Sequence, residues 1–174
     1  TTTAFSSGTV ALGTSVNAVN DAPVANGSAT LTAIDEDSSD PAGDTVSNLF
    51  SSNFSDSTDD VTSGSSADSL AGVVITANAA TSAQGTWQWS TDGSNWNNIA
   101  TSGLSDDNAL FLASTTTLRF VPAANFNGTP GSLTTRLVDD SSTAPSNADT
   151  VDADPNGTTT AFSSGTVALG TSVN

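Results

Sequence analysis

Apolar and polar residues alternate along several short segments of the chain, and this period-two pattern predicts β-strands with one buried face. Within residues 117–122, for example, Leu118 and Phe120 fall on one face and Pro122 ends the strand. The predicted strands are residues 29–34, 45–54, 73–77, 117–122, 132–138 and 166–173. For the last three strands, the side chains expected in the core are Leu118 and Phe120, then Leu133, Thr135 and Leu137, then Val167, Leu169 and Val173.

Residues 85–99 predict a β-hairpin, because Trp87 and Trp89 share one face and Asp92-Gly93 supplies a turn that tolerates positive φ. No window shows the 3.6-residue period of a helix, so no helix is expected. About seven short strands separated by Gly, Pro, Asn and Asp turns indicate an all-β fold, a two-sheet antiparallel β-sandwich. Residues 139–157 are polar and irregular, and we expect a long loop or an inserted hairpin there.

The two ends of the chain carry the same sequence. Residues 1–17 and 158–174 both read TTTAFSSGTVALGTSVN, at an offset of 157 residues. That period is too long for one solenoid turn but suits a whole domain. We therefore expect a domain-sized unit repeated in tandem within a larger protein. Residues 1–17 would be the closing strand of a preceding copy, 18–23 an inter-repeat linker, and 24–174 one complete β-sandwich repeat. Without that preceding copy, residues 1–17 should run as an extended strand held by a sandwich edge or a neighbouring molecule.

The charge of the chain narrows its possible partners. Its 18 acids face only two bases, Arg119 and Arg136, with no Lys or His, and the net charge is −16. Nucleic acids and anionic membranes need a basic surface, so neither is expected as a partner. Because like charge opposes a compact state, high salt or bound multivalent cations should neutralise it. No apolar run approaches the roughly 18 residues of a membrane span, and no signal peptide is visible.

The residue types also limit the kind of metal. The chain has no Cys and no His, which removes disulfides, thiolate chemistry and the commonest ligand of transition metals. Carboxylate and amide oxygens remain, and these suit hard cations such as Ca²⁺ or Mg²⁺.

The acids gather where strands are predicted to end. The clusters are Asp35, Glu36 and Asp37 with Asp40; Asp56, Asp59 and Asp60; Asp106 and Asp107; Asp139 and Asp140; and Asp149, Asp152 and Asp154. Successive strands of a sandwich end at opposite poles. The second and fourth clusters should therefore meet beside Asn20 and Asp21 at the pole where the linker enters, here called the linker end. The first cluster should lie at the opposite pole, here called the far end.

Six to eight oxygens at about 2.3–2.6 Å would hold a Ca²⁺ ion at the linker end. Acids also cap turns without any metal, which is the competing interpretation of each single cluster. Five clusters in a chain without lysine favour cations for the set as a whole.

Residues 152–157 form a more local candidate. They read Asp-Ala-Asp-Pro-Asn-Gly, the opening of a calcium loop, with Asp152, Asp154 and Asn156 as ligands and Gly157 for the sharp turn. Ser163 stands where the acid at the twelfth position would be, so a complete EF-hand loop is excluded.

Five segments follow one another in an order that is specific as a set. They are Val-Asn-Asp-Ala-Pro (19–23), Phe-Ser-Asp (54–56), Gly-Thr-Trp-Gln-Trp-Ser (85–90) with Asp92-Gly93 and Trp96, Leu-Arg-Phe-Val-Pro (118–122) with Asn-Phe-Asn-Gly-Thr (125–129), and Arg-Leu-Val-Asp (136–139). Over most of residues 19–174, this order resembles the cadherin-like extender repeats of giant RTX-type adhesins, which Gram-negative bacteria secrete.

The resemblance implies a cadherin-/immunoglobulin-like, Greek-key sandwich that several Ca²⁺ ions per repeat make rigid. The positions that match cadherin ligands are Glu36 for the first strand, Asp56 after the second, Asn20 and Asp21 in the linker, and Asp139 late in the unit. The cadherin Asp-x-Asp is here Asp56-Ser-Thr-Asp59-Asp60, which leaves open which acid binds, and this copy exceeds the roughly 100 residues of an immunoglobulin sandwich. The full set of candidate metal ligands is Asn20, Asp21, Asp35, Glu36, Asp37, Asp56, Asp59, Asp60, Asp139, Asp140, Asp152, Asp154 and Asn156.

Three functions compete. The leading hypothesis is a calcium-rigidified spacer on the bacterial cell surface, secreted by a type I system, with adjacent copies end to end as its partners and a terminal ligand-binding domain held away from the cell. The alternative is a carbohydrate-binding module that stacks a glycan on tryptophan, with two of the three indoles expected in the core and Trp96 exposed. An enzyme is not expected, because the paired carboxylates lie in polar loops without an apolar pocket to raise one pKa.

Overall fold

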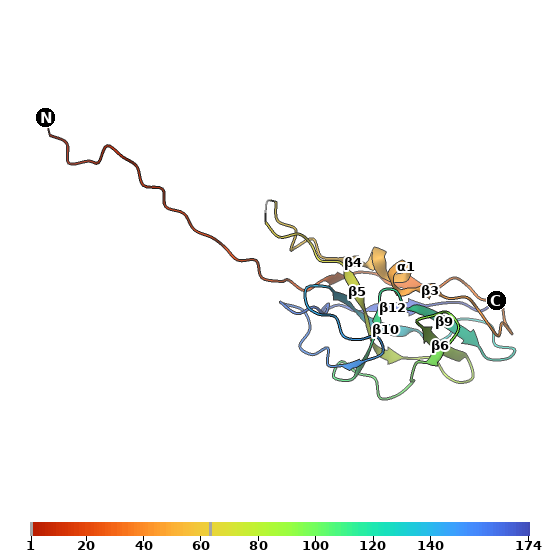
Figure 1. Cartoon of the computed structure of the whole chain (residues 1–174). Helices are drawn as coiled ribbons and strands as arrows, with labels where there is room; N and C mark the ends of the chain where they lie inside the picture. Colours follow the sequence, from red (N-terminus) through yellow and green to blue (C-terminus); the bar gives the residue numbers. More distant parts are fainter. Residues whose placement is uncertain (1, 63) are drawn as a thin grey trace.

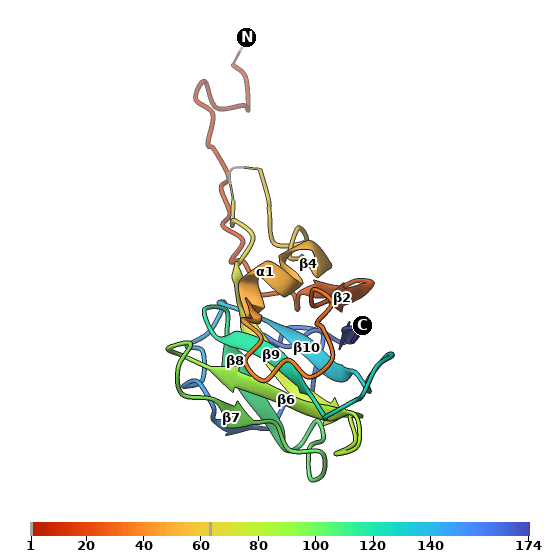
Figure 2. The same cartoon turned by 90° about the vertical axis from the view of Figure 1, so that its right-hand side faces the viewer.

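The computed structural model describes residues 2–62 and 64–174; Thr1, the first residue of the repeated end, lies outside them. The body consists of β-strands joined by loops, with one short helix and one 3₁₀ turn among the described residues (Figure 1, Figure 2). The elements are β1 (Val24–Ala25), β2 (Ser28–Thr30), β3 (Asp44–Thr45), α1 (Val46–Phe50), η1 (Ser51–Asn53), β4 (Phe54–Ser55), β5 (Leu70–Asn78), β6 (Gly85–Ser90), β7 (Asn97–Asn98), β8 (Ala109–Ala113), β9 (Thr117–Pro122), β10 (Leu133–Asp139), β11 (Thr150–Val151) and β12 (Val167–Gly170). The predicted all-β character is confirmed.

Two main sheets form the body. One has six strands in the order β11-β8-β5-β10-β12-β2, the other has four in the order β3-β9-β6-β7, and β1 pairs with β4 in a small separate ribbon. Apolar side chains of both main sheets meet in one core, including Leu133 and Leu137 from the first sheet and Trp87 and Phe120 from the second. The rings of Trp87 and Phe120 pack edge to face with centroids 5.2 Å apart. This arrangement is consistent with a β-sandwich.

Most predicted strands are present with the predicted face inward. The residues named for the last three strands, from Leu118 to Val173, are all buried. The predicted hairpin exists as β6 and β7, which pair antiparallel, with Gly93 at positive φ in the turn. Trp87 is fully buried and Trp89 is half-buried against the core, so the shared face is correct. Residues 139–157 are mostly loop, with a two-residue strand, β11, paired to β8.

Three predictions about the elements were wrong. Residues 46–50, predicted as strand, form the helix α1, because Val46, Leu49 and Phe50 recur at helical spacing and bury one face, and Thr45 caps the first turn. Strand β8 was not predicted. The sheet is also not purely antiparallel, because β12 pairs parallel to β2, both running from the linker end to the far end. No helix in the described part of the chain has the length and apolar character needed to cross a bilayer.

Residues 2–17 extend away from the body without joining either sheet (Figure 1). Leu12 is fully exposed, and Phe5, Val10 and Val16 are almost as exposed. The segment is extended, as predicted, but no sandwich edge holds it. The sheet is closed instead by β12 from the second copy of the same sequence. The tail leaves one end of the body, and the C-terminus lies at the opposite end (Figure 1). The linker end and the far end are therefore opposite ends of the folded body.

Candidate metal site

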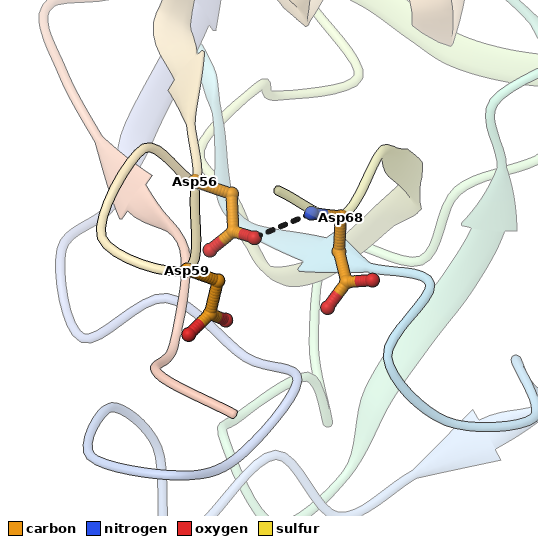
Figure 3. Close-up of side chains that lie close together, drawn as sticks. All are labelled: Asp56, Asp59 and Asp68. Carbon is orange, nitrogen blue, oxygen red and sulfur yellow. Dashed lines mark hydrogen bonds between the residues drawn. The ribbon is translucent and has the colours of Figure 1, made fainter. Parts of the chain in front are cut away.

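Three aspartates meet at the base of the loop that joins β4 to β5. Asp56 follows β4, Asp59 closes the next turn through a bond from its N–H to the Asp56 carbonyl (3.2 Å), and Asp68 lies just before β5. The Asp68 N–H donates to Oδ2 of Asp56 at 2.7 Å, which ties the two ends of the loop together (Figure 3). The three carboxyl groups therefore lie side by side, although the first and the last are twelve positions apart in the sequence.

The cluster is close and largely buried. One carboxylate oxygen from each of Asp56, Asp59 and Asp68 lies within 4.8 Å of the others. Asp56 is 4% exposed and Asp59 8%, whereas Asp68 is half-buried. Among residues 2–62 and 64–174, no other set of three acidic residues comes this close.

The linker contacts this cluster directly. The Asp21 N–H donates to both carboxylate oxygens of Asp59, at 3.0 and 3.2 Å. The Asn20 side chain donates from Nδ2 to the Thr160 carbonyl at 3.3 Å. Asn20, Asp59, Asp68 and Asp140 line one shallow hollow on the surface. The candidate site therefore includes the point where the linker joins the body.

The end of β10 brings two further acids to the same pole. Asp139 is 1% exposed and lies at a break in the β10–β5 register, and its Oδ1 accepts the Ser141 N–H at 3.0 Å. Asp140 accepts the Ser69 N–H through Oδ1 at 2.6 Å. The charge of Asp139 acts on Asp56, and Asp140 lines the same hollow as Asp59, so both acids lie at the predicted pole, although outside the three-acid cluster.

Four buried side-chain acceptor atoms have no hydrogen-bond partner among the described residues; one is Oδ1 of Asn53 in η1, and the other three belong to the acids and the linker of this pole. These three are Oδ1 of Asp56, Oδ2 of Asp139 and Oδ1 of Asn20. A buried acceptor without a partner costs roughly 1–3 kcal/mol, and more when it is charged. Hydrogen bonds to backbone N–H groups account for Oδ2 of Asp56 and Oδ1 of Asp139. They give the three unpartnered atoms no role.

The electrostatics of the cluster also favour a cation. Burial raises the pKa of Asp56, and the negative charges of Asp59 and Asp139 raise it further against the opposing bond from the Asp68 N–H. The pKa of Asp68 is raised by partial burial and by the charges of Asp139 and Asp140. Each effect disfavours the charged carboxylate, and a bound cation would reverse it.

No arginine neutralises the cluster. Arg119 pairs with Asp40 at 2.6 Å, and Arg136 pairs with Asp106 at 2.7 Å. The pair with Arg136 lowers the pKa of Asp106. Because these are the only two basic side chains of the chain, the acids of the linker end have no counter-charge among the residues that the structure describes.

The acids predicted at the far end do lie there, but they stay apart and exposed. The Glu36 N–H donates to the Asn174 carbonyl at 2.8 Å, which places the cluster beside the C-terminus. Asp37 accepts the Asn125 N–H through Oδ1 at 2.8 Å, and Asp35 is exposed. Asp60, predicted for the linker end, is also exposed. These residues are not brought into a cluster within one copy.

The predicted calcium loop at residues 152–157 forms a tight turn of its own. Oδ1 of Asp152 accepts the Asp154 N–H at 2.9 Å, and Gly157 takes positive φ, as predicted for a sharp turn. Asp152 and Asp154 are exposed, and Asn156 is half-buried. The structure does not group these three with any other acid.

Asp68 is the member of the cluster that the sequence reasoning missed. It lies in a Ser- and Ala-rich stretch without strand pattern or neighbouring acid, so nothing local marks it. The one available signal was its position directly before the buried strand β5, because acids at strand ends were the basis of the other assignments.

The chain matches no protein-family model, no curated protein and no solved structure. The function therefore has to be inferred from the geometry of the site.

Proposed function

We propose that the chain is a calcium-rigidified spacer repeat of a large bacterial surface adhesin. The observation that supports this most is the set of buried, unpartnered oxygens of Asp56, Asp139 and Asn20 around the Asp56–Asp59–Asp68 cluster, at the root of the linker. The cadherin-like, Greek-key variety of sandwich, secretion by a type I system and an extracellular location belong to the same proposal and rest on the sequence resemblance.

The ligands available suit Ca²⁺. Asp56, Asp59, Asp68 and Asp139 would supply carboxylate oxygens, Asn20 an amide oxygen, and water the remainder of the six to eight that Ca²⁺ takes. Mg²⁺ requires near-ideal octahedral geometry and shorter bonds, and it gives up its water reluctantly. A set of acids that comes from one long loop and a strand end fits the larger, more tolerant ion.

The ion would act on the linker. The Asp21 N–H already donates to the Asp59 carboxylate, and the unpartnered Oδ1 of Asn20 lies at the same pole. Binding would fix residues 18–23 against the body, and a preceding copy would be held at a set angle. The exposed acids Asp35, Glu36 and Asp37 at the far end of that copy would then face the linker end of this one. Several ions per junction, shared between copies, follow from this arrangement.

Calorimetric titration with Ca²⁺, with Mg²⁺ as the comparison ion, tests the site. We expect heat of binding for Ca²⁺ that Asp56→Asn removes. A chain of two copies, measured by small-angle X-ray scattering, should be extended and rigid in Ca²⁺ and shorter on average in EDTA. Equal scattering in both buffers, or an unchanged melting temperature in EDTA, would contradict the proposal.

Glycan binding remains the second candidate function, although the tryptophans favour it little. Trp87 is fully buried, and its indole N–H donates to the Gly131 carbonyl at 2.9 Å. The guanidinium of Arg119 lies 3.7 Å from the ring centre of Trp96 and covers one face of it. Trp96, predicted exposed, is half-buried like Trp89, and Trp89 lines a surface hollow together with Asn97 and Asn98. A glycan array without signal would remove this candidate.

The proposal does not include catalysis. The paired carboxylates of the linker end lie on a shallow hollow lined by polar residues, and no histidine, cysteine or lysine stands beside them. Incubation with a panel of glycosides and release of reducing ends would test this directly.

A further inference from the structure

One sequence occurs twice in this molecule in two different environments. In the second copy, Val167 and Leu169 are completely buried, whereas their counterparts Val10 and Leu12 are 96% and 100% exposed. Phe5 and Val16, the counterparts of Phe162 and Val173, are exposed as well. A segment whose side chains are arranged for burial thus stands in solvent.

The structure shows which surface this sequence fits. Strand β12 lies between β10 and β2, with Leu169 opposite Leu133 on one side and Ala29 on the other. The Thr135 hydroxyl donates to the Val167 carbonyl at 2.9 Å, and the Leu137 N–H donates to the Ser163 hydroxyl at 2.9 Å. Every side chain that makes these contacts in residues 158–174 recurs in residues 1–17.

The tail cannot reach this place in its own copy. Asn17 would take the position of Asn174 at the far end, whereas Asp21 and Ala22 are bonded to Asp59 and Thr158 at the linker end. Asn17 and Asp21 are four positions apart, a reach of at most about 14 Å. The parallel run from Ser28 to Ile34 alone covers roughly 20 Å, and Asp21 lies further back. The tail therefore fits another copy of the unit and not its own.

Charge does not prevent that contact. The first 20 residues contain no acid and no base, so every charged side chain lies in residues 21–174. The tail also leaves the body as an extended segment clear of both sheets (Figure 1).

We propose that residues 5–17 are a donor strand for a second copy of this chain. In that copy they take the place of residues 162–174 between β10 and β2. The donor and the displaced strand have the same sequence, so the exchanged pair makes the same hydrogen bonds and the same packing as the original one. Either strand can therefore occupy the place between β10 and β2. The strand that lies closer to it, or that carries no disruptive substitution, has the advantage. Successive exchanges would join molecules head to tail without any new interface.

Disulfide trapping in the full chain tests the exchange, because the natural sequence has no cysteine to compete. Thr134 lies opposite Ala168 in the β10–β12 register, and Ala11 is the counterpart of Ala168. The acceptor carries Thr134→Cys with Val167→Asp and Leu169→Asp, which keep its own closing strand out of the core. It also carries Val10→Asp and Leu12→Asp, which keep its own tail from closing other acceptor molecules. The donor carries Ala11→Cys. Directly opposed residues of paired strands are within disulfide distance, so the donor should link to the acceptor when supplied in excess.

A matched control donor carries Ala11→Cys with Val10→Asp and Leu12→Asp. Its yield of linked dimer should fall at least about tenfold, because two carboxylates would have to enter an apolar core. A register control carries Ser15→Cys instead of Ala11→Cys and should link as poorly. Equal yields from all three donors would overturn the proposal. So would addition of the donor to the outer edge of β2, because β2 and the β12 position would then separate residue 11 from Thr134.

The acceptor alone is expected to lose its cooperative fold, which supplies a second measurement. Adding the intact donor should restore the near-ultraviolet circular dichroism that arises from Trp87 in the core, whereas the control donor should not restore it. An acceptor that neither refolds nor links in excess donor would overturn the proposal, because residues 5–17 would then be unable to replace the closing strand.

Discussion

The two poles of the body both carry acids, but they use them differently. At the far end, Asp35, Glu36 and Asp37 are exposed. The Asp37 carboxylate accepts one hydrogen bond, from the backbone N–H of Asn125. At the linker end, Asp56 and Asp139 are buried, converge with other acids, and keep acceptor atoms without partners. Sequence composition cannot separate these cases, because both poles read as acidic turns. Burial without counter-charge is the property that distinguishes a candidate ligand set from ordinary turn capping.

The strongest test of this difference between the poles is to remove one carboxylate from each pole, in two separate variants. Saturation with Ca²⁺ at about a thousand times the dissociation constant should stabilise the wild-type chain by about 4 kcal/mol. In a chain of this size that corresponds to a rise in melting temperature of roughly 8–16 °C. Asp56→Asn should lose most of the rise, and Asp37→Asn should keep it, in calorimetric scans with Ca²⁺ and with EDTA. Loss of the rise in Asp37→Asn would reverse the assignment of the poles.

The second effect is the pH dependence of the metal-free protein. Since the folded-state pKa values of Asp56 and Asp68 are raised, the native state binds more protons than the unfolded state between the ordinary carboxyl pKa and these raised values. Lowering the pH from neutral through that window should therefore increase stability in EDTA. Further acidification should decrease it, because Asp106 has a lowered pKa and its pair with Arg136 is lost on protonation.

Urea midpoints across this pH range measure the effect. Adding Ca²⁺ should remove the mildly acidic optimum, and so should the double substitution of Asp56 and Asp68 by Asn. If the stability of the metal-free protein instead fell steadily as the pH was lowered from neutral, the ionised carboxylates of Asp56 and Asp68 would not be destabilising the fold.

A smaller effect concerns the hold on the linker. Asp59→Ala removes the acceptor of the Asp21 N–H, and this should cost about 1 kcal/mol locally, a roughly fivefold faster exchange of that amide in EDTA. Amide exchange followed by NMR is the measurement. Asp35→Ala at the far end is the control and should leave the Asp21 amide unchanged. An Asp21 amide that stays equally protected in Asp59→Ala would mean that other contacts hold the linker.

The smallest expected effect is that of Asp37→Asn on stability. Asp37 has a φ of 62°, a region that Asn also tolerates, and the new side-chain carbonyl can still accept the Asn125 N–H. The free energy of unfolding should change by less than about 0.5 kcal/mol. A larger loss in chemical denaturation would show that the charge of Asp37, and not only its shape, matters at the far end.

The strands could be predicted where one face is buried and the other is not. Alternation identified β9, β10 and β12 and the residues that they bury. Strand β8 reads Ala-Leu-Phe-Leu-Ala, and both of its faces contain buried residues, Phe111 on one and Leu112 on the other, so no alternation marks it. Helix α1 was missed for a different reason, its short length. Its three apolar residues span a single turn, too short a window for a helical period to stand out.

The candidate site could be predicted only in part. Strand order and direction suffice to bring Asp139 to Asp56, because both follow strands that end at the same pole. Asp68 and the unpartnered atoms depend on how a long loop closes, which no local pattern specifies. The repeated ends make the same point most directly. Identical residues form a buried strand at 167–170 and an exposed tail at 10–13, so the neighbours, and not the segment itself, determine its structure.

The parallel pairing of β2 with β12 has a mechanical consequence. The chain enters the body at the linker end before β2 and leaves it at the far end after β12. Tension along the chain would therefore pull these two neighbouring strands in opposite directions along their length. The bonds between them, from the Leu31 N–H to the Gly170 carbonyl and from the Ile34 N–H to the Ser172 carbonyl, both 2.9 Å, would be loaded together in shear. A pair pulled from the same end would instead open one bond at a time. The terminal strands are thus paired in the geometry that best resists being drawn apart by a load.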